Sequence, residues 1–145
     1  MPIIIDGWNL IRSDRSSIKD DEKDSLVSAS QLISYLSDFQ KTHNDPIVLV
    51  FDSTREHLHM HYANSSKLTV VPTKDADSYI KRYIDKVPER QRRNLRVVSS
   101  DKDIFFYAKG AYATPLSAED FWEKLKGRKI AKYRKIKEII CTGQM

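Results

Sequence analysis

The sequence predicts an α/β domain built on a mostly parallel sheet of four to five strands. Two short apolar runs, Ile3–Ile5 and Ile47–Phe51, show no polar alternation, which is typical of strands buried on both faces. Segments with apolar residues at steps of three and four lie between such runs, as expected for helices that cover a sheet. With 145 residues and 40% hydrophobic composition, the chain can bury the core of one domain.

The predicted elements follow one another as an alternation of strands and helices, which favours parallel pairing. Asp6 ends the first strand, and Gly7 lets the chain turn sharply before a polar loop over residues 12–24. The expected strands cover residues 3–5, 47–51, 67–71, 96–101 and, more weakly, 111–115. The expected helices cover residues 26–42, 76–87, 104–108 and 117–127.

The basic residues are concentrated in two places. The net charge of +5 is carried by the C-terminal segment, residues 127–145, which holds six basic side chains against Glu138. This segment is either a docked amphipathic helix or an arm that meets nucleic acid, and we separate it from a domain spanning residues 1–126. A solvated surface and a phosphate-binding surface both explain these basic clusters. The candidate nucleic-acid contacts are Arg90, Arg92, Arg93, Lys129, Lys132, Arg134 and Lys135.

Other classes of site and location are disfavoured by what the sequence lacks. A single cysteine, Cys141, offers neither an internal disulfide nor a cysteine zinc site. Neither a secretory signal nor an apolar run of about 18 residues is visible, so we expect a cytoplasmic protein without a membrane partner. No Gly-rich phosphate loop or dinucleotide-binding fingerprint is present. His57, His59 and His61 alternate and would share one face of a strand, but a polar excursion between two strands is the favoured interpretation.

Aspartates recur where the predicted strands end. They are Asp6, Asp52, Asp75 with Asp77, and Asp101 with Asp103. Parallel strands bring their carboxyl ends to one edge of a sheet, so these acids should meet there. Asp77 also lies on the apolar stripe that faces the sheet, where a carboxylate is costly without a partner. Helix capping explains acids at the start of this helix but not one that points inward.

Clustered carboxylates require protons or a cation. Like charges about 4 Å apart repel by roughly 4 kcal/mol at an effective dielectric constant of 20. Oxygen ligands favour hard ions, so Mg²⁺ or Mn²⁺ is the expected occupant. Such an ion can activate water and stabilise charge on a phosphoryl group, while basic patches hold an anionic chain.

Five motifs, taken together, resemble a known family. They are Ile-Ile-Asp6-Gly-Trp-Asn9-Leu-Ile, Val-Leu-Val-Phe-Asp52, Lys-Asp75-Ala-Asp77-Ser-Tyr-Ile80, Val-Val-Ser-Ser100-Asp101-Lys-Asp103 and Leu-Ser-Ala-Glu-Asp-Phe121. In this order they look like the motifs of NYN-domain proteins of the YacP-like branch, within the PIN-like superfamily of metal-dependent ribonucleases. The resemblance runs from Pro2 to about Leu125. One departure is the segment after Asp52, where relatives usually carry a Gly-rich or basic loop.

The resemblance implies a PIN-like three-layer α/β/α sandwich and an endoribonuclease that uses Mg²⁺ or Mn²⁺. Asp6 would be the central metal ligand and Asn9 would orient it or the substrate. Asp77 and Asp101 would complete the metal shell, with Asp103, Asp75 and Asp52 as support. The implied partner is RNA, either ribosome-associated mRNA or structured RNA, cleaved to leave a 5′-phosphate.

Two other functions are compatible with the same residues. One is an RNA-binding or adaptor module with little catalytic turnover, which predicts salt-dependent RNA binding without a metal-dependent product. The other is structure-specific DNA cleavage, which is least favoured because no helical arch or clamp insertion is visible in the sequence.

Overall fold

The structure is a computed structural model that describes residues 2–13, 25–52 and 67–127. Its centre is a five-stranded sheet in which all strand pairs are parallel. The strands are β1 (Ile3–Asp6), β2 (Ile47–Asp52), β3 (Leu68–Thr73), β4 (Arg96–Val98) and β5 (Thr114–Leu116), arranged in the order β3-β2-β1-β4-β5. The predicted α/β class and the parallel sheet are confirmed.

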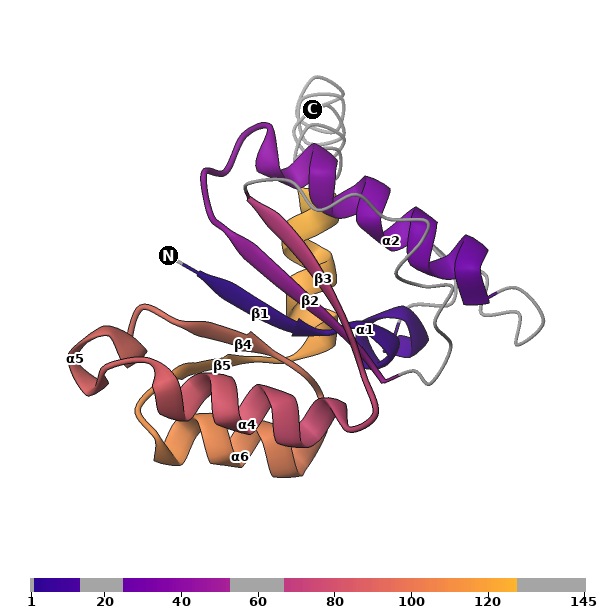
Figure 1. The fold of residues 1–145 in the computed structure, drawn as a ribbon. Helices are drawn as coiled ribbons and strands as arrows, with labels where there is room; N and C mark the ends of the chain where they lie inside the picture. Colours follow the sequence, from indigo (N-terminus) through magenta and orange to yellow (C-terminus); the bar gives the residue numbers. More distant parts are fainter. Residues whose placement is uncertain (1, 14–24, 53–66, 128–145) are drawn as a thin grey trace, which may run out of the picture.

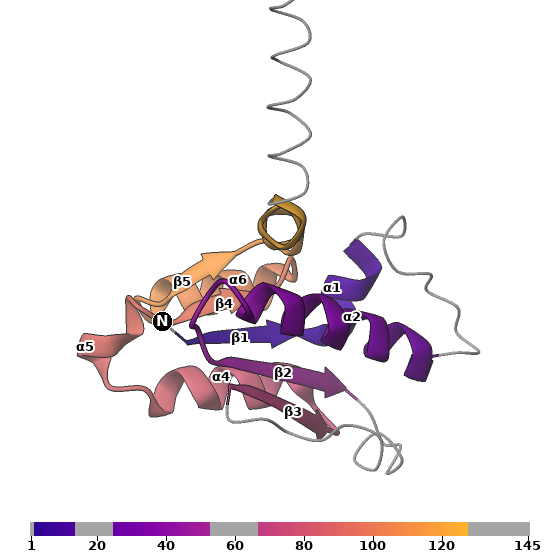
Figure 2. The same cartoon turned by 90° about the horizontal axis from the view of Figure 1, so that it is seen from above.

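Helices cover both faces of this sheet, giving three layers (Figures 1 and 2). The helices are α1 (Gly7–Ser13), α2 (Ser25–Gln40), α4 (Ala76–Lys86), α5 (Glu89–Arg92), α6 (Lys102–Gly110) and a segment over residues 118–127. One buried cluster joins the sheet to α1, α2 and residues 118–127, and includes Leu10, Leu36 and Phe121. A second cluster joins the opposite face to α4 and α6, and includes Ile80 and Ile104.

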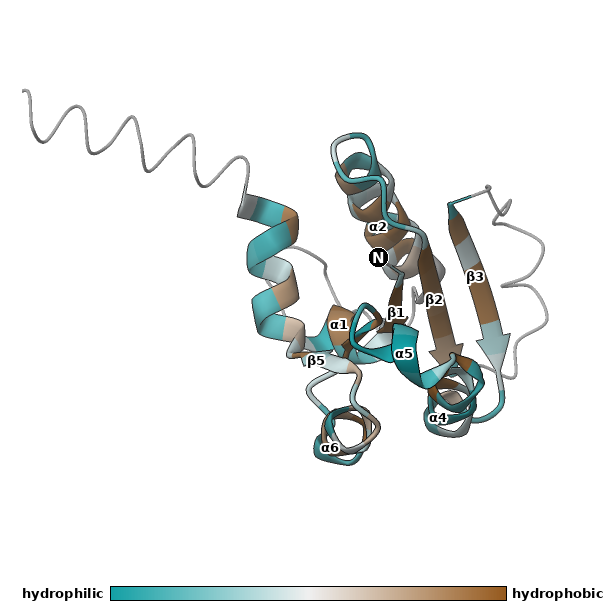
Figure 3. Ribbon diagram, turned by 90° about the vertical axis from the view of Figure 1, so that its left-hand side faces the viewer, coloured by the Kyte–Doolittle hydropathy of each residue, from teal (hydrophilic) through white to brown (hydrophobic). Residues whose placement is uncertain are grey.

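The apolar runs form these two cores because alternate residues of a strand point to opposite faces. Ile3 and Ile5 belong to the cluster under α2, whereas Ile4 belongs to the cluster under α4, and all three are at most 1% exposed. Figure 3 shows hydrophobic colour along β1 and β2 and hydrophilic colour on α5 and along the outer side of α4. The sheet is therefore the buried middle layer, as continuous apolar strands predict.

Two short helices were not predicted. Helix α1 begins directly at Gly7, where the sequence suggested a turn, and it is fixed because Leu10 and Ile11 are completely buried. Gly7 has no positive φ angle, so backbone freedom is not the reason for this glycine. A Cβ atom there would lie 2.5 Å from Cε1 of Phe51, so Gly7 is required for close packing. Helix α5 lacks buried residues and so carries no apolar period.

The order of the strands alone indicates which edge of the sheet binds ligands. The chain moves outward from β1 to β2 and β3 on one side, and returns to add β4 and β5 on the other. In open parallel sheets, ligands bind at the carboxyl ends of the strands where this order reverses. The reversal here lies between β1 and β4, whose carboxyl ends carry Asp6 and the Ser99–Asp101 segment.

Three predicted features lie wholly or mostly outside the described residues. They are the polar loop, of which residues 14–24 are not described and residues 12–13 belong to α1, the histidine run at residues 57–61, and the basic segment from residue 128 onward, with Lys129, Lys132, Arg134 and Lys135. Within the part of the chain that the structure describes, no helix combines the length and apolar character needed to span a bilayer.

Candidate active site

Asp6 lies at the corner between β1 and α1. Its carboxylate accepts a hydrogen bond from the backbone N–H of Asn9, three residues later in the chain. This is the arrangement of an N-cap, here at the start of α1. The hydroxyl of Ser99, itself only 1% exposed, lies 3.4 Å from Oδ2 of Asp6. Asp6 is therefore held by its own helix and by the neighbouring strand.

The surroundings of Asp6 disfavour its charge. Burial, followed by repulsion from Asp77 and then from Asp101, raises the pKa of the Asp6 carboxyl from 3.8 to about 6, although the bonds from Ser99 and Asn9 act in the opposite direction. Three carboxylates from three separate elements thus act on one another at the edge where the strand order reverses. Such mutual destabilisation is the electrostatic signature of a site prepared for a cation or a proton.

Asp77 reaches this edge from the first turn of α4. It is half-buried, and burial followed by repulsion from Asp101 and Asp75 raises its pKa, while Lys81 acts to lower it. Asp75 is the N-cap of the same helix and accepts hydrogen bonds from the backbone N–H and the hydroxyl of Ser78, at 3.1 and 2.7 Å. The two acids therefore have different roles: Asp75 starts the helix, and Asp77 is the acid whose charge acts on Asp6.

Asp101 and Asp103 belong to the start of α6. Asp101 is the N-cap and accepts a 2.8 Å hydrogen bond from the backbone of Asp103. The side chain of Asp103 is 67% exposed and pairs at 2.6 Å with Lys81 of α4. Lys81 therefore connects α4 with α6 beside the acids and partly compensates their charge.

A polar network fixes the loop after β4. Oδ1 of Asn9 accepts a 2.8 Å hydrogen bond from the backbone N–H of Ser100, and Ser99 Oγ accepts one of 3.1 Å from Asp101. The hydroxyl of Ser100 donates to Glu119 at 2.6 Å and accepts from the backbone of Ala118 at 2.9 Å. The side chain of Asn9 thus holds the loop that carries Asp101.

Asp52 takes a different position from the other acids. It ends β2, its side chain is exposed, and its backbone carbonyl accepts a 2.9 Å hydrogen bond from the indole of Trp8. Asp52 is not among the groups that shift the pKa of Asp6 or Asp77. The structure therefore groups Asp6, Asp77 and Asp101. Asp75 is connected to this group as the N-cap of α4, and Asp103 is connected to it by its ion pair with Lys81.

The side chains that the structure describes do not form a three-ligand metal site. Among the described residues, no group of three or more His, Cys, Asp or Glu side chains is arranged so that it could hold a metal ion. The donor chemistry nevertheless suits a hard cation, since carboxylate oxygens are the groups that repel one another here. Mg²⁺ keeps several waters and often takes only one or two protein carboxylates.

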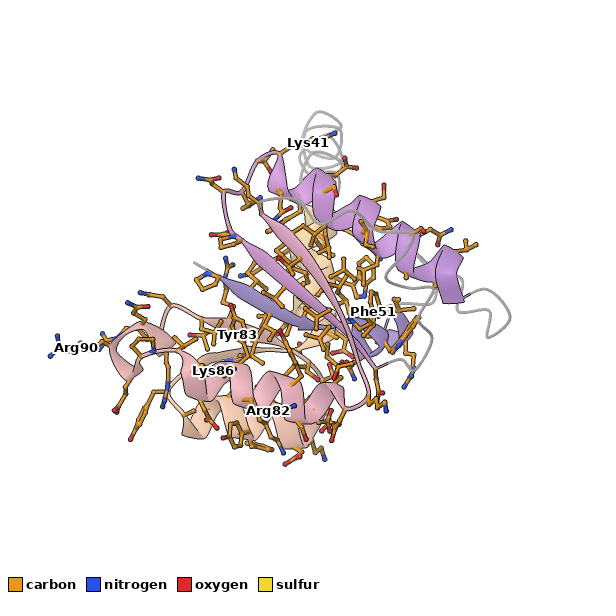
Figure 4. The ribbon with its side chains drawn as sticks, in the orientation of Figure 1. Lys41, Phe51, Arg82, Tyr83, Lys86 and Arg90 are labelled. Carbon is orange, nitrogen blue, oxygen red and sulfur yellow. The ribbon has the colours of Figure 1, made fainter. Side chains whose placement is uncertain are left out.

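The predicted basic residues divide into structural and exposed ones. Arg92 donates to the backbone carbonyls of Val87 and Asp85, at 2.9 and 3.2 Å, and so closes the connection between α4 and α5. Arg90 and Arg93 are exposed. Arg90 projects from α5, at the end of α4 remote from the acids (Figure 4). The described basic cluster therefore lies away from the acidic edge.

Sequence reasoning missed several polar residues of the site. Ser99, Ser100, Lys81 and Glu119 were not singled out as site residues, although the two serines immediately precede Asp101. The sequence did indicate a position near the acids for Lys81, because this residue lies four positions after Asp77 on the same helix. Glu119 had none, because its contact with Ser100 depends on the packing of residues 118–127 against the sheet.

The comparisons with known proteins agree with this architecture. Two crystal structures of Rae1 (YacP) from Bacillus subtilis have a similar fold. A mutant form is 21% identical with a TM-score of 0.71 over 97% of this chain and 84% of that chain. The other is 18% identical with a TM-score of 0.68 over 99% and 84%. Among curated proteins, no sequence relative matches.

The family assignment comes from the sequence as a whole. The model of the YacP-like NYN domain matches residues 3–142, which is nearly the entire chain. The matched range contains every acid of the carboxyl edge described above. The chain belongs to the YacP-like NYN domain family, a domain of the ribonuclease type.

Proposed function

We propose that this protein is an endoribonuclease that uses Mg²⁺ or Mn²⁺ and water to cleave RNA phosphodiester bonds at the carboxyl edge of its sheet. The observation that carries the proposal is the grouping of Asp6 with Asp77 and Asp101 at one edge, where burial first, and then repulsion from Asp77 and Asp101, raise the pKa of Asp6 to about 6. Membership of the NYN domain family supports RNA as the substrate class. The similar fold of Rae1 structures supports the same architecture.

The ion would be held by Asp6 with Asp77 or Asp101, and the remaining ligand positions would be filled by water and by the substrate phosphate. This set agrees with the absence of a three-ligand group among the described side chains. It also agrees with the preference of Mg²⁺ for few carboxylates and several waters. When bound, the ion would lower the pKa of a coordinated water and stabilise charge on the phosphoryl group.

The residues of the chain would prepare this site in three ways. Ser99 and the backbone of Asn9 hold the Asp6 carboxylate in place and favour its ionised form. The side chain of Asn9 fixes the loop that presents Asp101. Lys81, paired with Asp103, adds a positive charge that attracts the RNA backbone to an edge that is otherwise anionic.

The proposed reaction is hydrolysis with water as the attacking group. A water oxygen forms a bond to phosphorus, the bond from phosphorus to the 3′ oxygen breaks, and the products carry a 5′-phosphate and a 3′-hydroxyl. A proton passes to the leaving oxygen and the attacking water loses one, so no further reactant is needed. Product ends are therefore a direct check: a cyclic 2′,3′-phosphate would contradict attack by water.

The decisive variant is Asp6→Asn, which keeps the side-chain shape and its capping oxygen. Cleavage of a labelled RNA in Mg²⁺ should fall by at least about 10²-fold, because transition-state charge stabilisation of several kcal/mol is lost. Circular dichroism should show an intact fold. Undiminished cleavage by this variant would exclude the proposed role of Asp6, and cleavage by the wild type in EDTA would exclude the metal.

An RNA-binding or adaptor module with little turnover is the second candidate. It is favoured by one observation, that two of the predicted metal-site acids already have partners: Asp103 pairs with Lys81, and Asp75 caps α4. This function predicts salt-dependent RNA binding with no Mg²⁺-dependent product from the wild-type chain. Binding and cleavage assays on the same RNA distinguish the two.

The cellular substrate and location are a further part of the proposal. We propose that the protein acts in the cytoplasm, on ribosome-associated mRNA or on structured RNA. Sucrose-gradient fractionation of cell extracts separates these substrates, because the protein would sediment with ribosomes in the first case and remain in the light fractions in the second.

A further inference from the structure

The outer side of α4 carries a groove that the acidic edge does not explain. Tyr79, Arg82, Tyr83 and Lys86 line a cavity of about 230 Å³. Their spacing of three, one and three residues places them on one side of the helix. Figure 4 shows Arg82, Tyr83 and Lys86 on the C-terminal half of α4.

The groove is not needed to bury the helix. Ala76, Ile80 and Ile84 are at most 4% exposed and form the side of α4 that packs on the sheet. Tyr79 and Tyr83 are half-buried and contact the edge of that core. Two rings are therefore held in place while part of each remains open to a ligand, which reduces the entropy cost of stacking.

The charge of the groove suits an anionic ligand. Among the described residues no acid lines it, whereas Arg82 and Lys86 are cations. The nearest acid on this helix, Asp85, accepts hydrogen bonds from the hydroxyl of Tyr107 on α6, so it faces the other side. Arg82 donates to the carbonyl of Ser78 and is attracted to Asp75, which orients it toward the start of the helix.

The groove extends along α4 toward the exposed arginines of the next helical segment. Helix α4 begins at Ala76 beside Asp77, and Tyr79 follows within the first turn. The 11 residues of α4 span about 16 Å and end next to α5, where Arg90 and Arg93 are exposed. The groove residue Lys86 ends α4, and Arg90 on α5 lies just beyond this end of the helix (Figure 4).

We infer that this groove binds single-stranded RNA, with bases stacked on Tyr79 and Tyr83 and flanking phosphates contacting Arg82 and Lys86. Alternating rings and cations are the combination that single-stranded nucleic-acid sites use, because every base has a π face and every linkage has a charge. The groove has this role only if the chain acts on RNA, as proposed above. It would favour unpaired substrates.

The test measures binding of a fluorescein-labelled single-stranded RNA by fluorescence anisotropy in EDTA, where no metal-dependent cleavage occurs. Tyr79→Leu/Tyr83→Leu keeps apolar volume but removes both rings, and it should weaken binding by about tenfold or more. Tyr79→Phe/Tyr83→Phe is the matched control that keeps the rings and should bind as the wild type does. A fully paired RNA duplex should show no difference between these variants.

The cations are tested in the same assay. Arg82→Gln/Lys86→Gln should reduce the slope of log affinity against log salt by about 1.4, the value for two single-strand phosphate contacts. Lys41→Gln/Lys124→Gln removes the same charge from other parts of the surface and should change the slope by less than half as much. Lys41 lies far from α4 in Figure 4.

Two results would contradict the proposed binding of RNA in the groove. One is an unchanged RNA affinity of both the double leucine variant and the double glutamine variant of the groove, which would favour a protein as the ligand of this surface instead. The other is an equal loss for the two glutamine pairs, which would show general charge attraction alone. Because these assays do not depend on turnover, intact cleavage that requires Asp6 would still support the ribonuclease function in either case.

Discussion

Two partly buried aspartates at opposite edges of the sheet have opposite electrostatic surroundings. At the carboxyl edge, burial and repulsion from Asp77 and Asp101 raise the pKa of Asp6 to about 6. At the amino edge, burial acts to raise the pKa of Asp45, but attraction and hydrogen bonding from Arg96 are among the causes that bring it below its usual value. Nη2 of Arg96 lies 2.8 Å from Asp45.

The comparison separates an acid that stabilises the fold from an acid that costs stability. Asp45 joins the start of β4 to the segment before β2, and its charge is compensated within the chain. Asp6 is kept at the ligand-binding edge with two like charges acting on it. A fold retains such an unfavourable arrangement where a ligand supplies the compensation, which is why perturbed carboxylates mark functional sites.

The acids of the carboxyl edge should themselves differ in importance. Asp77→Asn removes a charge that acts directly on Asp6, whereas Asp103→Asn removes one that is paired with Lys81. We expect RNA cleavage in Mg²⁺ to fall by about 10²-fold or more for Asp77→Asn and by less than about tenfold for Asp103→Asn. Equal losses would mean that Asp103 also contacts the metal or the substrate.

Stability should change in opposite directions at the two edges. Because the folded-state pKa of Asp6 is raised, its ionisation destabilises the fold as pH increases from about 4 to 6 and above. Asp6→Asn should therefore increase the free energy of unfolding at pH 8 by on the order of 2 kcal/mol, with little gain at pH 4.

Asp45 has the reverse dependence. Its lowered pKa stabilises the fold above the usual carboxyl range, and this contribution is lost as pH falls. Asp45→Asn should reduce the free energy of unfolding at pH 8 by about 1–3 kcal/mol, because Arg96 loses a charged partner while its Nε has no hydrogen-bond partner among the described residues. Urea unfolding at pH 4 and pH 8 measures the free energy of unfolding of Asp6→Asn and Asp45→Asn. Changes of the same sign in the two variants at pH 8 would contradict the opposite roles of these aspartates.

The carboxyl edge also depends on the close approach of α1 to β2. Gly7→Ala would place a Cβ atom 2.5 Å from the Phe51 ring and 3.0 Å from the Val50 carbonyl oxygen. We expect destabilisation by about 1–3 kcal/mol in urea unfolding. Gly110→Ala is the matched control, since among the described residues no heavy atom beyond its own helix backbone and chain neighbours lies within 4 Å of a Cβ there, and it should be neutral or slightly stabilising.

The layers and most elements could be predicted because apolar periodicity records burial directly. The continuous runs at β1 and β2 and the stripe through Ile80 and Ile84 required no tertiary information. Helix α1 could not be predicted in this way, because its start, Gly-Trp-Asn, is typical of a turn. Its position is fixed by burial of Leu10 and by the 2.6 Å bond from Trp122 to the Leu10 carbonyl.

The candidate site was predictable in part for the same reason. Parallel strands bring their carboxyl ends together, so Asp6 and Asp101 could be placed at one edge, and helical spacing turned Asp77 inward. Spacing could not show that Asp103 pairs with Lys81 or that Asp52 stays outside the coupled group. The first outcome depends on a side-chain contact between α4 and α6, and the second on where β2 ends relative to the other acids.

The most direct test of the account is a ¹³C NMR titration of the aspartate carboxyl groups, with and without Mg²⁺. We expect Asp6 to titrate near pH 6 in EDTA and at lower pH in Mg²⁺, because a bound cation favours its charged form. Asp45 should titrate below its usual range in both conditions. An Asp6 carboxyl that titrates near 3.8 and does not respond to Mg²⁺ would contradict the central claim.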